Sequence, residues 1–187
     1  MGSNVREDIM TAARRAAQAH GYTGLNFREL AAEVGIKSAS IHYHFPTKVD
    51  LGAAVAKRYW EDSQAVLDGI WNGGPGASQA LRAYPDTFRR SLENGNRICL
   101  CSFMSAEHDD LPDPVRQEIS RFAEINVAWL TRVLSAATDM ETGACERRAR
   151  AIFAAVAGAQ LMARSQADVG VFDTLIEGYR DAGLLPA

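Results

Sequence analysis

The sequence predicts an all-α protein, and three observations support this fold class. Alternation of β-branched or aromatic residues with polar ones, the pattern of a half-buried strand, is almost absent. Alanine, leucine, arginine and glutamate, which favour helices, abound along the 187 residues. Apolar side chains recur at spacings of three and four, which places them on one face of a helix. We expect about nine helices, the first three forming an N-terminal domain and the rest a C-terminal helical domain.

Four helices are predicted near the N-terminus, over residues 5–20, 27–34, 38–45 and 48–70. The second begins with a capping box, in which Asn26 caps the helix and Glu29 is its reciprocal partner. Gly35 provides the tight turn before the third helix. Thr47 caps the fourth helix, with Asp50 at its third position.

Five further helices are predicted, over residues 78–93, 99–108, 114–137, 142–167 and 171–182. The segment 72–76 (NGGPG) is the clearest helix breaker in the sequence. Pro85 either kinks the helix over 78–93 or marks its true start, because proline donates no main-chain hydrogen bond. Asp113 can cap the long helix that follows it.

Composition limits the functional classes. Hydrophobic residues make up 47% of the chain, enough for a core, and the net charge of −3 excludes a generally basic nucleic-acid coat. The longest apolar run, 151–159, is far shorter than the ~18 residues of a membrane span. The three cysteines are odd in number, and residues 4–8 carry charges of both signs where a signal peptide would be apolar. We therefore expect reduced thiols and a cytoplasmic location.

The charges are unevenly distributed along the chain. Residues 1–60 carry a net charge of +3 and the remaining residues a net charge of −6. This asymmetry favours a phosphate-binding face in the N-terminal part, although an ordinary solvated surface explains it as well.

Residues 27–45 have the spacing of a helix-turn-helix, with a short helix, a glycine turn and a second helix of about two turns. Leu30, Ala31 and Ile41 belong to the core that the two helices share. The second helix keeps a free face of small, hydroxyl, imidazole and phenol groups that suits the major groove: Lys37, Ser38, Ala39, Ser40, His42, Tyr43 and His44. Arg28 and Lys48 flank this face, where DNA phosphates would lie.

Two segments, FRELA at 27–31 and VGIKSASIHYHFPTKVDL at 34–51, resemble the N-terminal signature of the TetR family of transcriptional regulators. The resemblance covers roughly the first quarter of the chain, and beyond it only helix number and lengths agree. It implies a homodimer whose N-terminal domains enter successive major grooves of a palindromic operator. It also implies a C-terminal pocket for a small-molecule inducer and a four-helix dimer interface made by the last two helices.

The resemblance also implies roles for single residues. Base or groove contacts are implied for Lys37, Ser38, Ser40, His42 and Tyr43, and phosphate contacts for Asn26, His44 and Lys48. His42 replaces the phenol usual in the family and Ala39 its glycine or proline, so the operator sequence does not follow. The alternative for Tyr43 and His44 is packing of the helix end, and for Lys48 a solvated helix start. A metal pair at His42 and His44 is rejected, because their side chains diverge by ~200° on a helix.

Asn126 and Gln160 interrupt apolar stripes of two long predicted helices in the C-terminal part. A buried amide needs hydrogen-bond partners, so each is either a polar anchor for a ligand or satisfied by neighbouring backbone. The candidate walls of a pocket are Phe88, Cys99, Phe103, Met104, Phe122, Trp129 and Phe153. Ordinary core packing is the alternative for these residues.

Cys99 and Cys101 suggest a second mode of sensing. They cannot easily close a disulfide within a helix, and Arg97 is the basic residue beside them. Some members of the family sense reactive compounds through cysteines in this region. The resemblance therefore implies a thiol-based redox or electrophile sensor as an alternative, and simple burial is the favoured interpretation.

Within the predicted helix over 142–167, the stretch 149–163 is apolar nearly all round, which favours burial against both its own core and a partner chain. The last predicted helix supplies a second apolar face. The expected dimer contacts are Ile152, Val156, Ala159, Phe172, Leu175, Ile176 and Tyr179.

These features predict a helix-turn-helix DNA-binding domain over 1–47 and an effector-binding and dimerisation domain over 48–187. The predicted function is a repressor that a small-molecule inducer releases from operator DNA. The alternatives are a dimeric scaffold that no longer binds DNA and a small helical enzyme. The enzyme is disfavoured, because the sequence has no phosphate-binding glycine loop, metal-ligand set or nucleophile–histidine arrangement. We expect no cofactor, no metal and no membrane.

Overall fold

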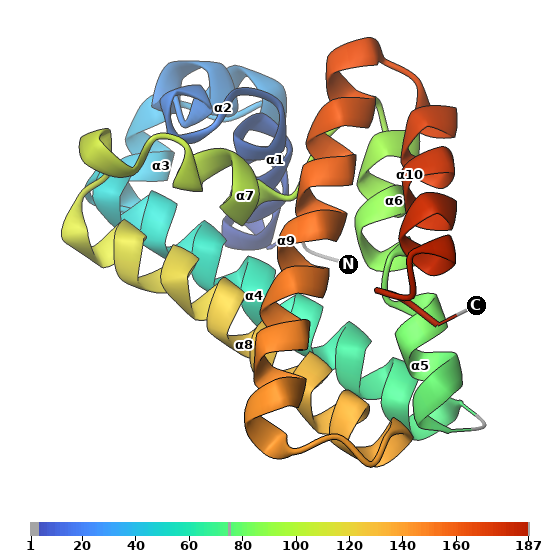
Figure 1. The fold of residues 1–187 in the computed structure, drawn as a ribbon. Coiled ribbons are helices and arrows are strands. Elements are labelled where there is room, and N and C mark those ends of the chain that lie inside the picture. Colours follow the sequence, from blue (N-terminus) through green and yellow to red (C-terminus); the bar gives the residue numbers. More distant parts are fainter. Residues whose placement is uncertain (1–3, 75, 187) are drawn as a thin grey trace. The chain divides into compact units, whose positions relative to one another are not determined.

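A computed structural model describes residues 4–74 and 76–186, and all regular elements in these residues are helices (Figure 1). Pro75, inside the predicted helix breaker, lies outside them. The helices group into two compact units. Unit 1 comprises Met1–Glu61 and Leu100–Phe122, and unit 2 comprises Asp62–Cys99 and Ala123–Ala187. Two of the three unit boundaries fall within long helices, and the third falls between residues 99 and 100, where a short helix begins. The functional division between residues 47 and 48 stays a prediction.

Unit 1 holds the helix-turn-helix. Its elements are α1 (Val5–His20), η1 (Tyr22–Gly24), α2 (Phe27–Val34), α3 (Ser38–His44), the start of α4 (Lys48–Gly73), α7 (Leu100–Ser105), η2 (His108–Asp110) and the start of α8 (Asp113–Ala137). Helix α1 packs against α2, α3 and α7. The core between these helices consists of fully buried apolar side chains: Ile9, Ala13, Ala17, Leu30, Ala31 and Ile41.

Three local signals in the sequence set boundaries of α2 and α4. The Asn26 side chain accepts hydrogen bonds from the main-chain N–H groups of Arg28 and Glu29, as the predicted capping box requires. Gly35 ends α2 in the left-handed conformation, with φ 76°. The Thr47 hydroxyl accepts from Asp50 N at 3.1 Å while Asp50 accepts from Thr47 N at 3.0 Å, so the cap predicted for α4 is confirmed.

Unit 2 contains α5 (Ala77–Ala83), α6 (Asp86–Glu93), α9 (Thr142–Gln166), α10 (Val169–Asp181) and the ends of α4 and α8. Helix α9 packs against α6 and α10, which also contact each other. Pro85 separates α5 from α6, so one helix predicted over 78–93 is two helices in the structure. The Pro85 carbonyl accepts from Phe88 N and Arg89 N, because Pro85 precedes the first turn of α6.

Two predicted helices end three residues away from where the structure ends them. The helix predicted over 99–108 is the shorter α7 followed by η2, and its end is a turn in which Ala106 N bonds to Phe103 O, three residues back. Helix α4 continues three residues past the predicted end, to Gly73. Among the residues described, no helix is both long and apolar enough to cross a membrane.

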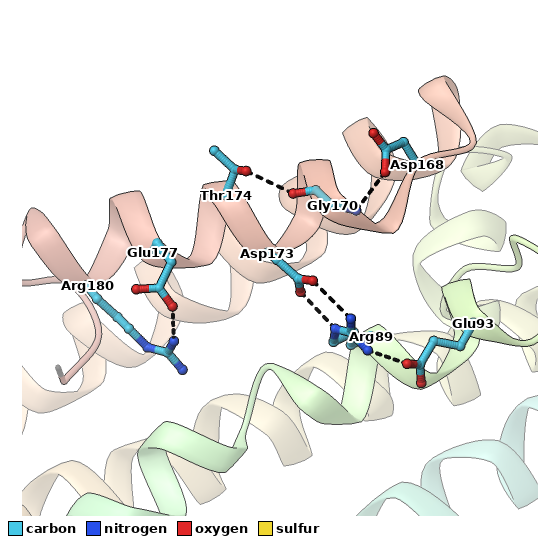
Figure 2. Close-up of polar contacts among 8 residues, drawn as sticks. All are labelled: Arg89, Glu93, Asp168, Gly170, Asp173, Thr174, Glu177 and Arg180. Atoms are coloured by element: carbon cyan, nitrogen blue, oxygen red, sulfur yellow. Dashed lines mark hydrogen bonds and ion pairs between the residues drawn. The ribbon is translucent and has the colours of Figure 1, made fainter.

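An ion pair ties α6 to α10 (Figure 2). The Arg89 guanidinium donates to both carboxylate oxygens of Asp173, at 2.8 and 2.9 Å, and also pairs with Glu93 one turn further along α6. At the start of α10, Asp168 caps the helix by accepting from Gly170 N at 2.8 Å. The bidentate contact between Arg89 and Asp173 thereby holds α6 and α10 together.

We predict that the Asp173→Asn variant is less stable than the wild type at neutral pH but not at acidic pH. The hydrogen bonds from Arg89 lower the pKa of Asp173 below its ordinary value of 3.8. The pair therefore stabilises the fold at neutral pH, and this contribution disappears as the pH falls below 3.8 towards the folded-state pKa. Because Asp173 is 48% exposed, we expect a loss of at most about 1 kcal/mol at pH 7.

Urea unfolding of the wild type and Asp173→Asn at pH 7 and at pH 3 measures this difference. Glu177→Gln, which breaks an exposed pair with Arg180 on the same helix, is the control and should change the free energy of unfolding less. A difference between wild type and Asp173→Asn that is as large at pH 3 as at pH 7 would contradict the assignment.

Candidate functional site

The face predicted to enter DNA lies on the solvent side of α3. Ile41 is buried and anchors the helix, while Lys37, His42 and Tyr43 are exposed and Ser38 and Ser40 are half-buried. Tyr43 is 85% exposed, which rules out packing of the helix end as its role. His44 is half-buried, and its ring meets the edge of Tyr43 at 5.1 Å between centroids.

His42 is held in one orientation by two neighbours. Its Nδ1 lies 3.3 Å from the Pro46 carbonyl oxygen, and its ring centroid lies 4.7 Å from that of Phe27. Since a carbonyl oxygen only accepts, this hydrogen bond requires the proton on Nδ1. The neutral imidazole then presents Nε2 as an acceptor.

The residues predicted to flank the face are placed differently from one another. Arg28 is exposed. The Asn26 amide is engaged in capping α2, where it also donates to a carboxylate oxygen of Glu29 at 3.2 Å. Lys48 is half-buried, with Nζ 4.4 Å from the centre of the Tyr22 ring, so a cation–π contact positions its ammonium group.

A contact that sequence reasoning missed joins the α7–α8 connection to the turn before α2. Tyr22 N donates to Glu107 Oε2 at 2.7 Å. Gly21 makes room for this carboxylate: its φ is 65° and its ψ −155°, and a Cβ there would lie 2.7 Å from Glu107 Cδ. The two partners are 85 positions apart in sequence, so no local sequence pattern points to this contact.

The candidate ligand-binding residues divide between the units. Unit 2 holds Phe88, Cys99, Asn126, Trp129, Phe153 and Gln160, and unit 1 holds Phe103, Met104 and Phe122. Gln160 is buried, and both ends of its amide are engaged: Nε2 donates to Phe88 O at 2.6 Å, and Oε1 accepts from Cys99 N at 2.8 Å. This is the backbone-satisfied arrangement, and it fixes the chain just before α7.

Asn126 has a partner that the sequence analysis did not name. Its Oδ1 accepts from the hydroxyl of Tyr84 at 2.9 Å, and both side chains are buried. Burial first, and then the Cys99 thiol, raise the pKa of Tyr84, so its phenol stays neutral and remains a donor. The spacing of Leu81, Tyr84 and Phe88 on one predicted helix face is the signal that points to Tyr84.

Four aromatic side chains of unit 2 form a continuous series. Trp129 stacks on Tyr84 with 5.8 Å between ring centroids, and Tyr84 meets Phe88 at the same distance. Phe88 in turn meets Phe153 edge-on at 6.3 Å. The interior of unit 2 therefore combines an aromatic surface with the Tyr84–Asn126 hydrogen bond, which is the composition of small-molecule sites in general.

The three cysteines are free thiols and all are buried. Cys99 belongs to unit 2 and Cys101 to unit 1. Burial limits the access of oxidants and electrophiles, which react with exposed thiolates, so nothing in this geometry favours the thiol-sensor alternative. Within residues 4–74 and 76–186 there is no cluster of three or more His, Cys, Asp or Glu side chains able to hold a metal ion.

Most of the predicted dimer contacts lie inside the chain itself. Ile152, Val156, Ala159, Phe172 and Ile176 are buried in unit 2, and Leu175 and Tyr179 are half-buried. This placement corrects the prediction for the five buried residues, because side chains with almost no exposed surface offer a partner little to contact, while Leu175 and Tyr179 stay predicted contacts. The solvent side of α9 carries a stripe of mostly small and apolar residues instead: Ala151, Ala154, Gly158, Leu161, Met162 and Ser165. Leu161 and Met162 are 59% and 50% exposed.

Comparison with known proteins gives a consistent result. A sequence profile described as bacterial regulatory proteins, tetR family, matches residues 9–55. No curated protein matches the chain in sequence. A solved structure of a TetR transcriptional regulator from Legionella pneumophila is 31% identical to this chain in sequence. The match covers 96% of this chain and 95% of the Legionella chain, with a TM-score of 0.88.

Two further solved structures resemble the chain over nearly its whole length. A TetR-family transcriptional regulator from Agrobacterium tumefaciens is 27% identical over 95% of this chain and 96% of its own, with a TM-score of 0.88. The reduced form of NemR from E. coli is 20% identical, and the match covers 95% of this chain and 96% of the NemR chain. Its TM-score of 0.81 shows a shared fold.

Proposed function

This chain belongs to the TetR family of transcriptional regulators, and we propose that it is a homodimeric repressor released from a palindromic operator by a small-molecule inducer. The observation that carries the proposal is the solvent face of α3. A short helix anchored by one buried residue, Ile41, presents small, hydroxyl, imidazole and phenol groups outward. Such a helix fits the major groove, and its side chains can read base edges there.

The proposed division of roles follows the exposure of each residue. Lys37, Ser38, Ser40, His42 and Tyr43 make the base and groove contacts. Arg28, His44 and Lys48 face phosphates, and Asn26 contributes by orienting the first turn of α2. His42 offers Nε2 as an acceptor, which favours an amino group on the base edge that it meets.

We place the dimer contact on the stripe of residues defined above on α9. Leu161 and Met162 are large apolar side chains left exposed on a helix whose opposite face is buried. The small residues Ala154 and Gly158 let a second helix approach closely, and a Cβ built at Gly158 meets nothing within 4 Å. A two-fold axis through this stripe would bury it against its own copy, which suits a palindromic site.

The proposed inducer binds in unit 2, among the aromatic series and the Tyr84–Asn126 pair. Gln160 holds Cys99 N, and α7 starts at the next residue. Beyond α7, Glu107 binds Tyr22 N beside the reading helices, and the Tyr22 ring positions Lys48. A ligand that displaces the segment around Cys99 therefore moves α7 and the carboxylate that supports the turn before α2.

The test is binding to a palindromic DNA fragment taken from near the protein's own gene, measured by fluorescence anisotropy over a range of KCl concentrations. We expect an affinity that falls steeply with salt, because phosphate contacts release counterions. Binding to a single half-site should be much weaker than to the palindrome. A protein that binds the palindrome no better than an unrelated duplex would overturn the proposal in favour of the dimeric scaffold.

We predict that Leu161→Glu disrupts the dimer without unfolding the chain. A charge at the centre of the stripe would be buried without a partner, so sedimentation should give the monomer mass of 20.3 kDa in place of twice that value. Val66→Glu, at an exposed apolar position on α4, is the matched control and should stay dimeric. A dimer that survives Leu161→Glu would contradict the proposed face.

A further inference from the structure

One buried polar atom in unit 2 lacks a hydrogen-bond partner. Among residues 4–74 and 76–186, the unpartnered buried side-chain nitrogen is Trp129 Nε1. Trp129 is 2% exposed, so water at the surface does not satisfy this N–H group. A buried donor without an acceptor is destabilising, and folded proteins rarely retain one unless something else binds to it.

The side chains that the structure places in contact with Trp129 and its neighbour Tyr84 are aromatic or polar. The Trp129 ring stacks on Tyr84, whose hydroxyl is already committed to Asn126. The pKa of Tyr84 is raised by burial and by the Cys99 thiol. None of these contacts between described residues involves a lysine or arginine side chain. A carboxylate bound beside Trp129 would therefore be buried without a counter-ion.

We propose that unit 2 binds an uncharged aromatic compound and that Trp129 Nε1 donates a hydrogen bond to a carbonyl, nitro or ether oxygen on it. The inference rests on the proposed inducer pocket and narrows the ligand to this chemical class. The ring of the ligand packs against the series formed by Trp129, Tyr84, Phe88 and Phe153. The oxygen acceptor supplies what the indole lacks, so the ligand is selected by this one bond as well as by its apolar area.

The experiment compares two probes of similar size, acetophenone and ethylbenzene, of which only the first has an oxygen acceptor. The three tryptophans give three indole N–H signals in the ¹⁵N-labelled protein, and each is assigned by its Trp→Phe variant. We expect acetophenone to shift the Trp129 signal downfield in the wild type, and ethylbenzene to leave it near its starting position. Benzoate, the charged counterpart, should bind more weakly than acetophenone.

Trp129→Phe keeps a ring but removes the donor. We expect acetophenone to bind this variant about tenfold more weakly, with ethylbenzene affected by less than about twofold. Trp60→Phe is the matched control, because Trp60 Nε1 already donates to Glu118 Oε2 at 2.7 Å, in unit 1. It should leave the binding of both probes unchanged.

Three results would overturn the inference. The first is a Trp129 signal that acetophenone does not shift, and the second is an equal loss of affinity for acetophenone and ethylbenzene in Trp129→Phe. The third is a bound water that stays on the indole at saturating acetophenone. If Trp129→Phe does not fold, the wild-type shifts decide by themselves. The measurement needs no DNA, so it separates the site from its regulatory use. A protein that binds acetophenone at Trp129 without any change in operator affinity would retain this site and refute release by an inducer.

Discussion

Tyr43→Ala is expected to weaken binding to the palindromic operator by about ten- to a hundredfold, with no change in the free energy of unfolding. Tyr43 is 85% exposed on the solvent face of α3, so it contributes little to the core. A base-edge contact in the major groove is worth about 1–3 kcal/mol, which sets the size of the effect. Fluorescence anisotropy with the palindrome measures the affinity, and urea unfolding measures the stability.

Lys48→Ala should also reduce operator affinity, but through a different dependence on salt. Lys48 is held over the Tyr22 ring at the edge of the face, where a phosphate contact is proposed. Loss of one phosphate contact lowers the slope of log affinity against log salt concentration by about 1, uniformly across sequences. Lys57→Ala, at an exposed position further along α4, is the control and should keep the wild-type slope.

The two variants together test the assignment of the reading face. Tyr43→Ala should lose discrimination between the operator and an unrelated duplex, whereas Lys48→Ala should lose affinity for both. Unchanged operator binding in both variants would remove α3 as the reading helix. Retention of the dimer in both, checked by sedimentation, shows that any loss arises at the DNA contact.

Gly21→Ala is expected to destabilise unit 1 by about 3 kcal/mol. The combination of φ 65° with ψ −155° is a region of backbone conformation that only glycine adopts without strain. A methyl group there also meets the Glu107 carboxylate, with 2.7 Å between Cβ and Cδ. The carboxylate can move aside only by giving up its hydrogen bond to Tyr22 N.

Gly35→Ala is the matched control for the cost of placing an alanine at a positive φ. Gly35 also has a positive φ, 76°, but in the milder left-handed region, and a Cβ there meets nothing within 4 Å. We expect it to cost only about 1 kcal/mol. The difference between the two glycine variants, measured by urea unfolding, therefore reports the special conformation and the Glu107 contact together.

Glu107→Ala in the Gly21→Ala background separates these two contributions. Removing the carboxylate relieves the steric conflict but not the strained φ and ψ, so part of the lost stability should return. Glu107→Ala alone should destabilise the protein mildly, by the one hydrogen bond to Tyr22 N. If Gly21→Ala costs no more than Gly35→Ala, the proposed support of the α1–α2 turn by Glu107 is wrong.

The local features of the fold could be predicted from the sequence, because they depend on neighbours a few residues away. The Asn26 and Thr47 caps and the left-handed Gly35 are short-range interactions, and all three are confirmed. Asn26 and Gly35 determine where α2 begins and ends, and Thr47 determines where α4 begins, whereas α3 starts without a side-chain cap. The effect of Pro85 was predicted only in part. The sequence indicated a kink or a helix start at this position, whereas the structure has two separate helices on either side of it.

Only the tertiary structure decided which contacts form between distant segments. Periodicity identified α9 as apolar on several sides but could not say which side faces inward, because that depends on where α6 and α10 pack. The burial of Ile152 and Val156 and the exposure of Leu161 followed from this packing. Likewise, Gln160 with Cys99 and Glu107 with Tyr22 are pairs separated by 61 and 85 positions. The helical period of 3.6 residues depends on side chains close together in the sequence. Whether two polar groups far apart in the sequence form a hydrogen bond depends instead on how the whole chain packs.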